Sequence, residues 1–268
     1  MVRRRHNLLV AVVVLLWITV VLWLDHGLGP GGATMAEQRW LGVGTWLLLA
    51  ALLAAEETRT RIQVGVVVVF ATLIEYTFSY ALHVYVYRLH DVPWFVPPGH
   101  GLVYLGALAI GRSSWVLERA TWLLPATFGL AAGYSGWGLF VSGRTDVLGA
   151  LWCACLGLFL WKGRQPTVFV GAFVVVTYLE LVGTHLGNWT WQVRDPILHL
   201  VPMGNPPSGA AGGYGFFDAA ALVLAPVVER AITARRRVRV LAADRAHDLV
   251  VQPPVGTQHA ASVAVVDA

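Results

Sequence analysis

The chain has 268 residues, of which 57% are hydrophobic and 13% are charged, and its mean hydropathy is +0.63. This composition excludes a single soluble domain and is typical of a polytopic membrane protein. The formal net charge of +4 does not indicate a nucleic-acid partner, because the Arg and Lys residues lie between apolar runs, as in membrane topology signals.

Eight apolar segments are candidates for transmembrane helices, which need about 20 residues each. Residues 1–6 include three arginines and precede an apolar run that is longer than the apolar region of a signal peptide. We therefore expect the first helix to remain in the protein and not to be cleaved off. The predicted helices cover residues 7–24, 40–55, 62–87, 100–114, 118–141, 146–161, 167–187 and 212–232. The predicted fold class is an all-α integral membrane protein with about eight transmembrane helices.

The distribution of Arg and Lys predicts the orientation of these helices. Most of them lie on one side if the N-terminus is cytoplasmic, which predicts a multi-pass protein of the plasma membrane with both termini cytoplasmic. We expect a membrane domain over residues 1–233. Residues 234–268 are basic and then mixed, with Pro, Gly and Ala, and predict a mostly disordered cytoplasmic tail.

An internal repeat relates the two halves of the membrane domain. Glu75 is followed 21 residues later by Val96-Pro, and Glu180 is followed 21 residues later by Val201-Pro, so the two copies are offset by 105 residues. The same offset aligns the third helix with the seventh and the fourth with the eighth. It predicts two parallel four-helix repeats, about 1–115 and 116–233, related by a pseudo-twofold axis along the membrane normal.

Glu75 and Glu180 are the candidate catalytic residues. A carboxylate inside a bilayer costs roughly 2.5–3.5 kcal/mol and almost always faces a protein interior or a wet cavity. Each is followed at +4 and +8 by polar residues that share its helix face, namely Ser79 and His83, and Thr184 and Asn188. Carboxyl groups in such sites serve as general acids. The alternative is that both glutamates only bridge helices as intramembrane polar contacts.

Further polar residues near the predicted outer face are candidates for binding or orienting a substrate. They are His100, His185, Trp189, Trp191, Asn205 and Asp218. Asp218 follows the start of the eighth helix, where it would also favour the helix dipole. No metal cofactor is predicted. A metal at the outer-face histidines remains an alternative, since His83 and His90 are seven residues apart, on one face of a helix.

A short motif suggests a second type of enzyme. Residues 133–136, Gly-Tyr-Ser-Gly, resemble the GxSG of rhomboid-type intramembrane proteases, which would make Ser135 the nucleophile and His185 its base. The favoured alternative is that Gly129, Gly133 and Gly136 are small residues that let helices approach closely.

A longer pattern occurs in both halves: an intramembrane Glu, alternating aromatics (Tyr85 and Tyr87; Trp189 and Trp191), and a Val-Pro stretch. It resembles the membrane carotenoid hydratase family of carotenoid biosynthesis, and Gly183 and Gly187 fit the family's glycines in the second half. The resemblance implies addition of water across a terminal isoprenoid double bond, with Glu as the acid. Aromatics would stabilise the cation, and the candidates are Tyr76, Tyr80, Trp189 and Trp191.

Our first functional hypothesis is therefore a membrane enzyme that acts on an isoprenoid or other apolar lipid in an outer-leaflet cavity. The alternative is a proton-, ion- or solute-coupled transporter with the paired glutamates at the repeat interface. A third possibility is an assembly protein whose glutamates are tied into helix contacts. The sequence does not predict an oligomeric state.

Overall fold

The computed structural model describes residues 2–27 and 31–251. Its elements are α1 (Val2–His26), α2 (Met35–Ala54), α3 (Thr58–Glu75), the π-helix η1 (Tyr76–Ala81), β1 (Tyr85–Tyr87), α4 (Val96–Gly111), α5 (Ser114–Glu118), α6 (Ala120–Phe140), α7 (Val147–Lys162), α8 (Pro166–His185), β2 (Trp189–Trp191) and α9 (Ala210–Val251). The chain forms two compact units, and the second begins at Val227 within α9. The helix bundle and the candidate site belong to the first unit.

The first helix illustrates how the bundle uses apolar residues on both faces of a helix. On α1, Val10, Val14 and Val21 follow helical spacing and are buried against the rest of the bundle. The opposite face carries apolar side chains that are exposed, such as Leu8 (66%) and Leu16 (60%). A helix that is apolar all round is typical of a membrane span.

Four helices in the described part of the chain are long and apolar enough to cross a membrane: Arg5–His26, Thr58–Ala81, Pro166–His185 and Ala210–Arg235. The helix Val147–Lys162 is also apolar but shorter. The chain is thus a mostly helical membrane protein, as its composition predicts. Each of the eight predicted helices has a counterpart among the observed ones, with α5 as an additional short turn of helix.

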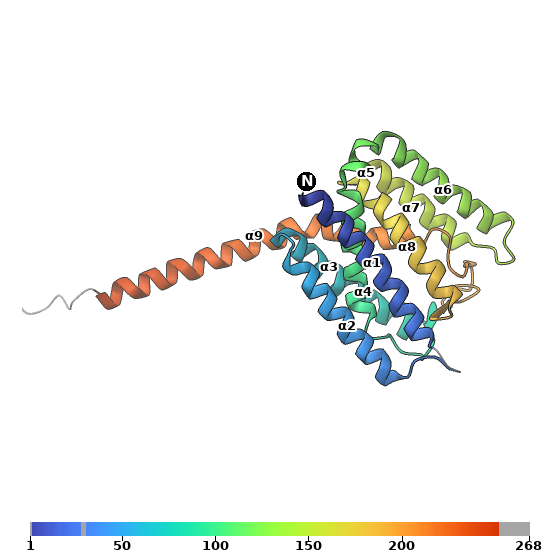
Figure 1. Ribbon diagram of the computed structural model, residues 1–268, viewed down its shortest axis with the longest axis horizontal. Helices are drawn as coiled ribbons and strands as arrows, with labels where there is room; N and C mark the ends of the chain where they lie inside the picture. The colour runs from blue at the N-terminus through green and yellow to red at the C-terminus, as the bar shows by residue number, and fades with distance from the viewer. Residues whose placement is uncertain (1, 28–30, 252–268) are drawn as a thin grey trace, which may run out of the picture. The chain divides into compact units, whose positions relative to one another are not determined.

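The short helix α4 is the centre of the bundle. It packs against α1, α3 and α8, and nearly all of its 16 residues are buried. In Figure 1, α2 and α3 lie toward one side of the bundle and α6 and α7 toward the other. At the contact between α4 and α8, a Cβ on Gly171 would lie only 2.2 Å from the Ala107 carbonyl oxygen. Glycine is needed here because any side chain would push the two helices apart.

The predicted third helix ends earlier than its apolar pattern indicates. It ends at residue 81, not 87, and His83 then adopts a positive φ of 53°. The next segments, Tyr-Val-Tyr and Trp-Thr-Trp, consist of aromatic and β-branched residues, which favour strands. They form a short antiparallel pair within a fold that is otherwise all-α, as predicted. The paired residues are Tyr85–Trp191, Val86–Thr190 and Tyr87–Trp189.

The last helix is longer than predicted. We expected it to end near residue 232, followed by a disordered tail over 234–268, but α9 continues to Val251. The segment after Thr233 is rich in Ala and Arg, which have high helix propensity. The rest of the predicted tail, residues 252–268, lies outside the described residues.

Candidate functional site

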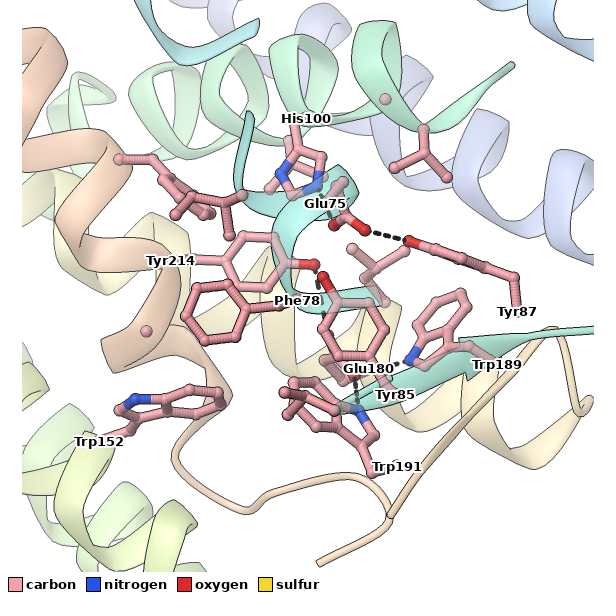
Figure 2. A pocket seen from close by; sticks show the side chains of 18 of the residues that line it. Glu75, Phe78, Tyr85, Tyr87, His100, Trp152, Glu180, Trp189, Trp191 and Tyr214 are labelled. Atoms are coloured by element: carbon pink, nitrogen blue, oxygen red, sulfur yellow. Dashed lines mark hydrogen bonds and ion pairs between the residues drawn. The ribbon is translucent and has the colours of Figure 1, made fainter. Parts of the chain in front are cut away.

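A cavity of about 620 Å³ lies between α1, α3, α4, α7, α8 and α9, beside the two strands. Its wall is mostly apolar and aromatic, and Glu75, Glu180 and His100 are among its polar residues. Both glutamates are almost completely buried, with 4% and 3% of their surface exposed. Figure 2 shows the two glutamates in one pocket, each surrounded by its own set of hydrogen-bonding side chains.

Glu75, the last residue of α3, is held by His100 and Tyr87. His100 Nε2 lies 2.9 Å from Glu75 Oε1, and the Tyr87 hydroxyl donates to Glu75 Oε2 at 2.9 Å. Burial, and next the charge of Glu75, raise the pKa of Tyr87 well above its ordinary value. Tyr87 therefore remains a hydrogen-bond donor at any physiological pH. His100 is itself 6% exposed and stacks on Tyr214, with ring centroids 5.1 Å apart.

Glu180, on α8, has three different partners. The indole N–H groups of Trp189 and Trp191 both donate to Glu180 Oε2, each at 3.1 Å. The Tyr214 hydroxyl lies 3.3 Å from the other oxygen, Oε1. An indole N–H can only donate, so Oε2 accepts two hydrogen bonds and cannot carry a proton. Any proton on Glu180 must sit on Oε1, next to Tyr214.

The strand pair positions the two indoles. Trp191 is fixed by the Asn205 side-chain oxygen, which accepts from its backbone N–H at 2.9 Å. Its ring lies between Tyr85, at 4.5 Å, and Trp152, at 5.7 Å between centroids. Trp189 lies over α8, where a Cβ on Gly183 would come within 1.9 Å of the indole ring. The absence of a side chain at residue 183 thus makes room for Trp189.

The loop after β2 is anchored by a buried carboxylate, Asp146. Its Oδ1 accepts from the backbone N–H groups of Gly149 and Gly204, at 2.9 and 2.8 Å. Its Oδ2 accepts from the backbone N–H and the hydroxyl of Ser208, at 2.6 and 2.7 Å. Arg144 adds hydrogen bonds to backbone oxygens of β2 and of the loop. These contacts hold the loop segment that lines the cavity with Val201 and Met203.

Several residues that the sequence predicted on the glutamate face do not line the cavity. Because α3 changes to a π-helix and ends, His83 leaves the helix and its Nδ1 lies 3.0 Å from the Ser79 carbonyl oxygen. Ser79 is buried but faces elsewhere. Thr184 donates to the backbone oxygen of Glu180, at 2.6 Å, one turn earlier in its own helix.

The other predicted polar residues have different positions. Asn188 is buried outside the cavity, where its side chain donates to Asp25 at 2.7 Å. Asp25 also forms an ion pair with Arg88, at 3.1 Å. His185 is exposed at the end of α8, and Asp218 is buried away from the cavity lining. Of the predicted site, the structure therefore brings together Glu75, Glu180, His100, Trp189 and Trp191, with Asn205 supporting Trp191.

Two further expectations are corrected. Tyr76 and Tyr80 are 46% and 56% exposed and do not line the cavity, so they are not cation-stabilising rings. Ser135 of the GxSG motif is buried against the Ser208 hydroxyl, at 3.2 Å, and this hydroxyl donates to Asp146. The motif is a structural contact. The neighbouring glycines do not mediate close helix approach, because nothing lies within 4 Å of a Cβ built on Gly129, Gly133 or Gly136.

Three cavity residues were not among the predicted site residues: Tyr87 and Tyr214, which bond the glutamates, and Trp152, which packs on Trp191. Tyr87 belongs to the alternating aromatic pattern, which was a usable signal, because the residue opposite it in the strand pair is Trp189. Tyr214 lies 34 residues from Glu180, and no local pattern identifies such a partner. Trp152 lies in an apolar helix whose sequence does not distinguish a lipid-facing tryptophan from a cavity residue.

The geometry of the site defines its chemistry. Glu75 and His100 share one hydrogen bond, across which a proton can be transferred, while Glu180 offers an acceptor oxygen that indoles hold in place. Among the described residues, no three His, Cys, Asp or Glu side chains are gathered to hold a metal ion.

No family model, curated protein or solved structure matches the chain.

Proposed function

We propose that the protein is a multi-pass membrane enzyme that transfers a proton to and from an isoprenoid or another apolar lipid. The observation that carries this proposal is the pair of buried glutamates on one aromatic cavity, one of them bonded to a buried histidine. Structural bridging alone would not leave an open cavity beside both carboxyl groups. The volume falls within the roughly 300–1,000 Å³ of small-molecule sites.

The cavity wall favours an apolar substrate that arrives from the membrane. Four lining side chains, Phe78, Leu151, Ile197 and Phe216, are between 37% and 59% exposed on the outside of the bundle. An apolar rim of this kind matches the acyl or isoprenoid chain of a lipid better than a hydrated solute. The cavity would enclose the reacting end of the molecule, while the rest of a long chain remains in the bilayer.

The hydrogen bonds support different roles for the two glutamates. Glu75 and His100 form the proton-transferring pair, because each has an atom that can either donate or accept. Glu180 stabilises positive charge as a carboxylate, with its Oε2 held in place by two indole donors. The rings of Tyr85, Trp189 and Trp191 add cation–π stabilisation.

Hydration of a terminal double bond is the reaction that uses all these groups. The acid gives its proton to one alkene carbon, and the π electrons form the new C–H bond, which leaves a tertiary carbocation at the other carbon. A water oxygen then bonds this carbon, and the proton that the water loses returns to the carboxylate. The resemblance to membrane carotenoid hydratases, which rests on the Glu, aromatic and Val-Pro pattern, favours the same reaction.

The proposed two-repeat architecture receives support from the strand pair. A shift of 105 residues converts the pair Tyr85–Trp191 into Thr190–Val86, which is also a pair of the sheet. It converts Tyr87–Trp189 into Gln192–Val84, and these are joined by a backbone hydrogen bond of 3.0 Å. We accordingly propose two parallel repeats that meet at this sheet, with eight spans. From the distribution of Arg and Lys we also propose a plasma-membrane location with both termini cytoplasmic.

The test compares lipids and pigments extracted from cells that carry the wild-type gene, a deletion, Glu75→Gln or Glu180→Gln. Glu118→Gln is the matched control, since this carboxylate is exposed on the short helix α5. Protein levels in the membrane are measured in every strain. We expect a hydrated lipid to disappear in the deletion and in both cavity variants, and to persist in Glu118→Gln.

If the lipids of the deletion strain are unchanged, the proposed enzymatic function is refuted. The transport alternative predicts that result, together with proton or solute uptake into vesicles that contain the purified protein and loss of this uptake in the cavity variants.

A further inference from the structure

A second set of buried polar side chains lies outside the cavity. Gln63, Tyr104 and Asp218 are 0%, 1% and 5% exposed, and none of them lines the cavity. Gln63 Nε2 and the Tyr104 hydroxyl have no hydrogen-bond partner in residues 2–27 and 31–251. The Asp218 carboxyl group is buried within electrostatic range of Tyr104. Buried polar groups are almost always bonded to protein or to internal water, so the two unpartnered groups beside a buried carboxyl group indicate water.

These side chains continue from the cavity along two helices. On α4, Tyr104 is one turn after His100, and on α9, Asp218 is one turn after Tyr214. The rings of His100 and Tyr214 stack at 5.1 Å, and Tyr104 lies within electrostatic range of Asp218. The second pair is therefore about 6 Å from the first, at 1.5 Å per residue.

The set extends to the end of the bundle where α3 begins and α4 ends. Arg112, which follows α4 and is partly exposed, donates to the Thr60 hydroxyl at 3.1 Å and lies 3.5 Å from Gln63 Oε1. Gln63 precedes Glu75 by 12 residues on α3, or about 18 Å. Arg59, at the start of α3, is also within electrostatic range of Tyr104. Polar groups thus occur from the partly exposed Arg112 to the buried Glu75.

We propose that Gln63, Tyr104 and Asp218 bind a file of internal water molecules that connects the Arg112 end of the bundle to the cavity. Its role as a water supply rests on the proposed function. Each hydration consumes one water molecule, and a lipid that enters through the apolar rim fills that opening. Water then needs a separate entrance, and the polar groups between α3, α4 and α9 supply one.

Hydroxyl-radical footprinting of the intact protein in lipid nanodiscs, with heavy-oxygen water, tests the file without any substrate. Radicals formed from internal water oxidise the side chains beside it. Tyr104 should be labelled at a rate close to that of Trp115, which is 49% exposed on the short helix α5, outside the candidate spans. Phe169, which is 1% exposed and stacks on Phe159 at 5.0 Å, is the dry control and should remain unlabelled.

Replacement of polar by apolar side chains should remove the water. We expect Asp218→Leu and Gln63→Leu to abolish labelling of Tyr104 without changing that of Trp115. A wild-type Tyr104 as unreactive as Phe169 would overturn the water file, and this measurement needs no variant to fold. Footprinting and lipid analysis are independent: a dry Tyr104 with an intact lipid product would refute only the file, and a wet Tyr104 with unchanged lipids would refute only the enzyme.

Discussion

Replacing Gly183 by Ala tests the packing that places Trp189 against Glu180. The added Cβ would lie 1.9 Å from the Trp189 ring, whereas ordinary contacts begin near 3.4 Å. The ring must therefore move by about 1.5 Å, which breaks its 3.1 Å hydrogen bond to Glu180. Overpacking costs about 1–3 kcal/mol and the lost hydrogen bond about 1 kcal/mol.

The expected total is a loss of about 2–4 kcal/mol in the free energy of unfolding. For a domain of this size, this loss lowers Tm by roughly 4–16 °C. Gly133→Ala is the matched control, because this glycine is also helical but nothing lies within 4 Å of its Cβ position. Alanine at such a site stabilises a helix by about 0.4–1 kcal/mol, so Tm should rise slightly.

Thermal unfolding of both purified variants in the same detergent gives the comparison, and lipid analysis of the corresponding cells gives the effect on function. We expect Gly183→Ala to lose both stability and product, and Gly133→Ala to lose neither. If Gly183→Ala unfolds at the wild-type temperature and retains its product, Trp189 does not pack on α8 as described, and its role in holding Glu180 is wrong.

Three further predictions concern the polar contacts around the site. Asp146→Ala should lower the free energy of unfolding by at least about 3 kcal/mol, since it leaves buried N–H groups unpaired, and Asp146→Asn should cost less because Oδ1 is retained; equal melting temperatures for the two variants would contradict this. Asp25→Ala should cost about 3–5 kcal/mol because it leaves Arg88 without its buried partner, and a change within 0.5 kcal/mol would count against the ion pair. Backbone N–H bonds lower the pKa of Asp195 to about 2. Its stabilising effect is therefore complete above the unfolded pKa of about 3.9 and lost as the pH falls through 2. Amide protection of Leu198 and Val201, whose N–H groups donate to Asp195, should follow this course and should be absent at pH 7 in Asp195→Ala.

The helices were predictable where a local pattern defines them. Apolar runs located all eight, because hydrophobicity is a local property of the sequence, and four of these helices in the described residues are long and apolar enough to cross a membrane. The end of the third helix was missed because Tyr-Val-Tyr continues the apolar run and becomes a strand only when it pairs with Trp-Thr-Trp, about 100 residues later. The length of α9 was underestimated because a loss of apolar residues was taken as the end of a helix. Beyond its apolar part, helix propensity alone continues α9.

The residues of the candidate site were likewise predictable only where a local sequence pattern marks them. The spacing of Glu75 and Glu180 in two similar segments identified the acidic pair, since a carboxyl group in an apolar run has few structural explanations. The prediction that Ser79 and His83 share a helix face with Glu75 assumed a regular helix, and the π-helix and positive φ of His83 invalidate it. Tyr214 was not predictable as a partner, because 34 residues separate it from Glu180.

By itself, the sequence determined that the chain lies in a membrane, where its helices occur and that two glutamates lie at equivalent positions in similar segments. These conclusions follow from hydrophobicity and spacing, which act over one or two helical turns. Only the tertiary structure decided that Glu75 binds His100, that two indoles hold Glu180 and that Gly183 makes room for one of them. Such contacts depend on how helices approach one another, and this is set by packing among residues far apart in the chain.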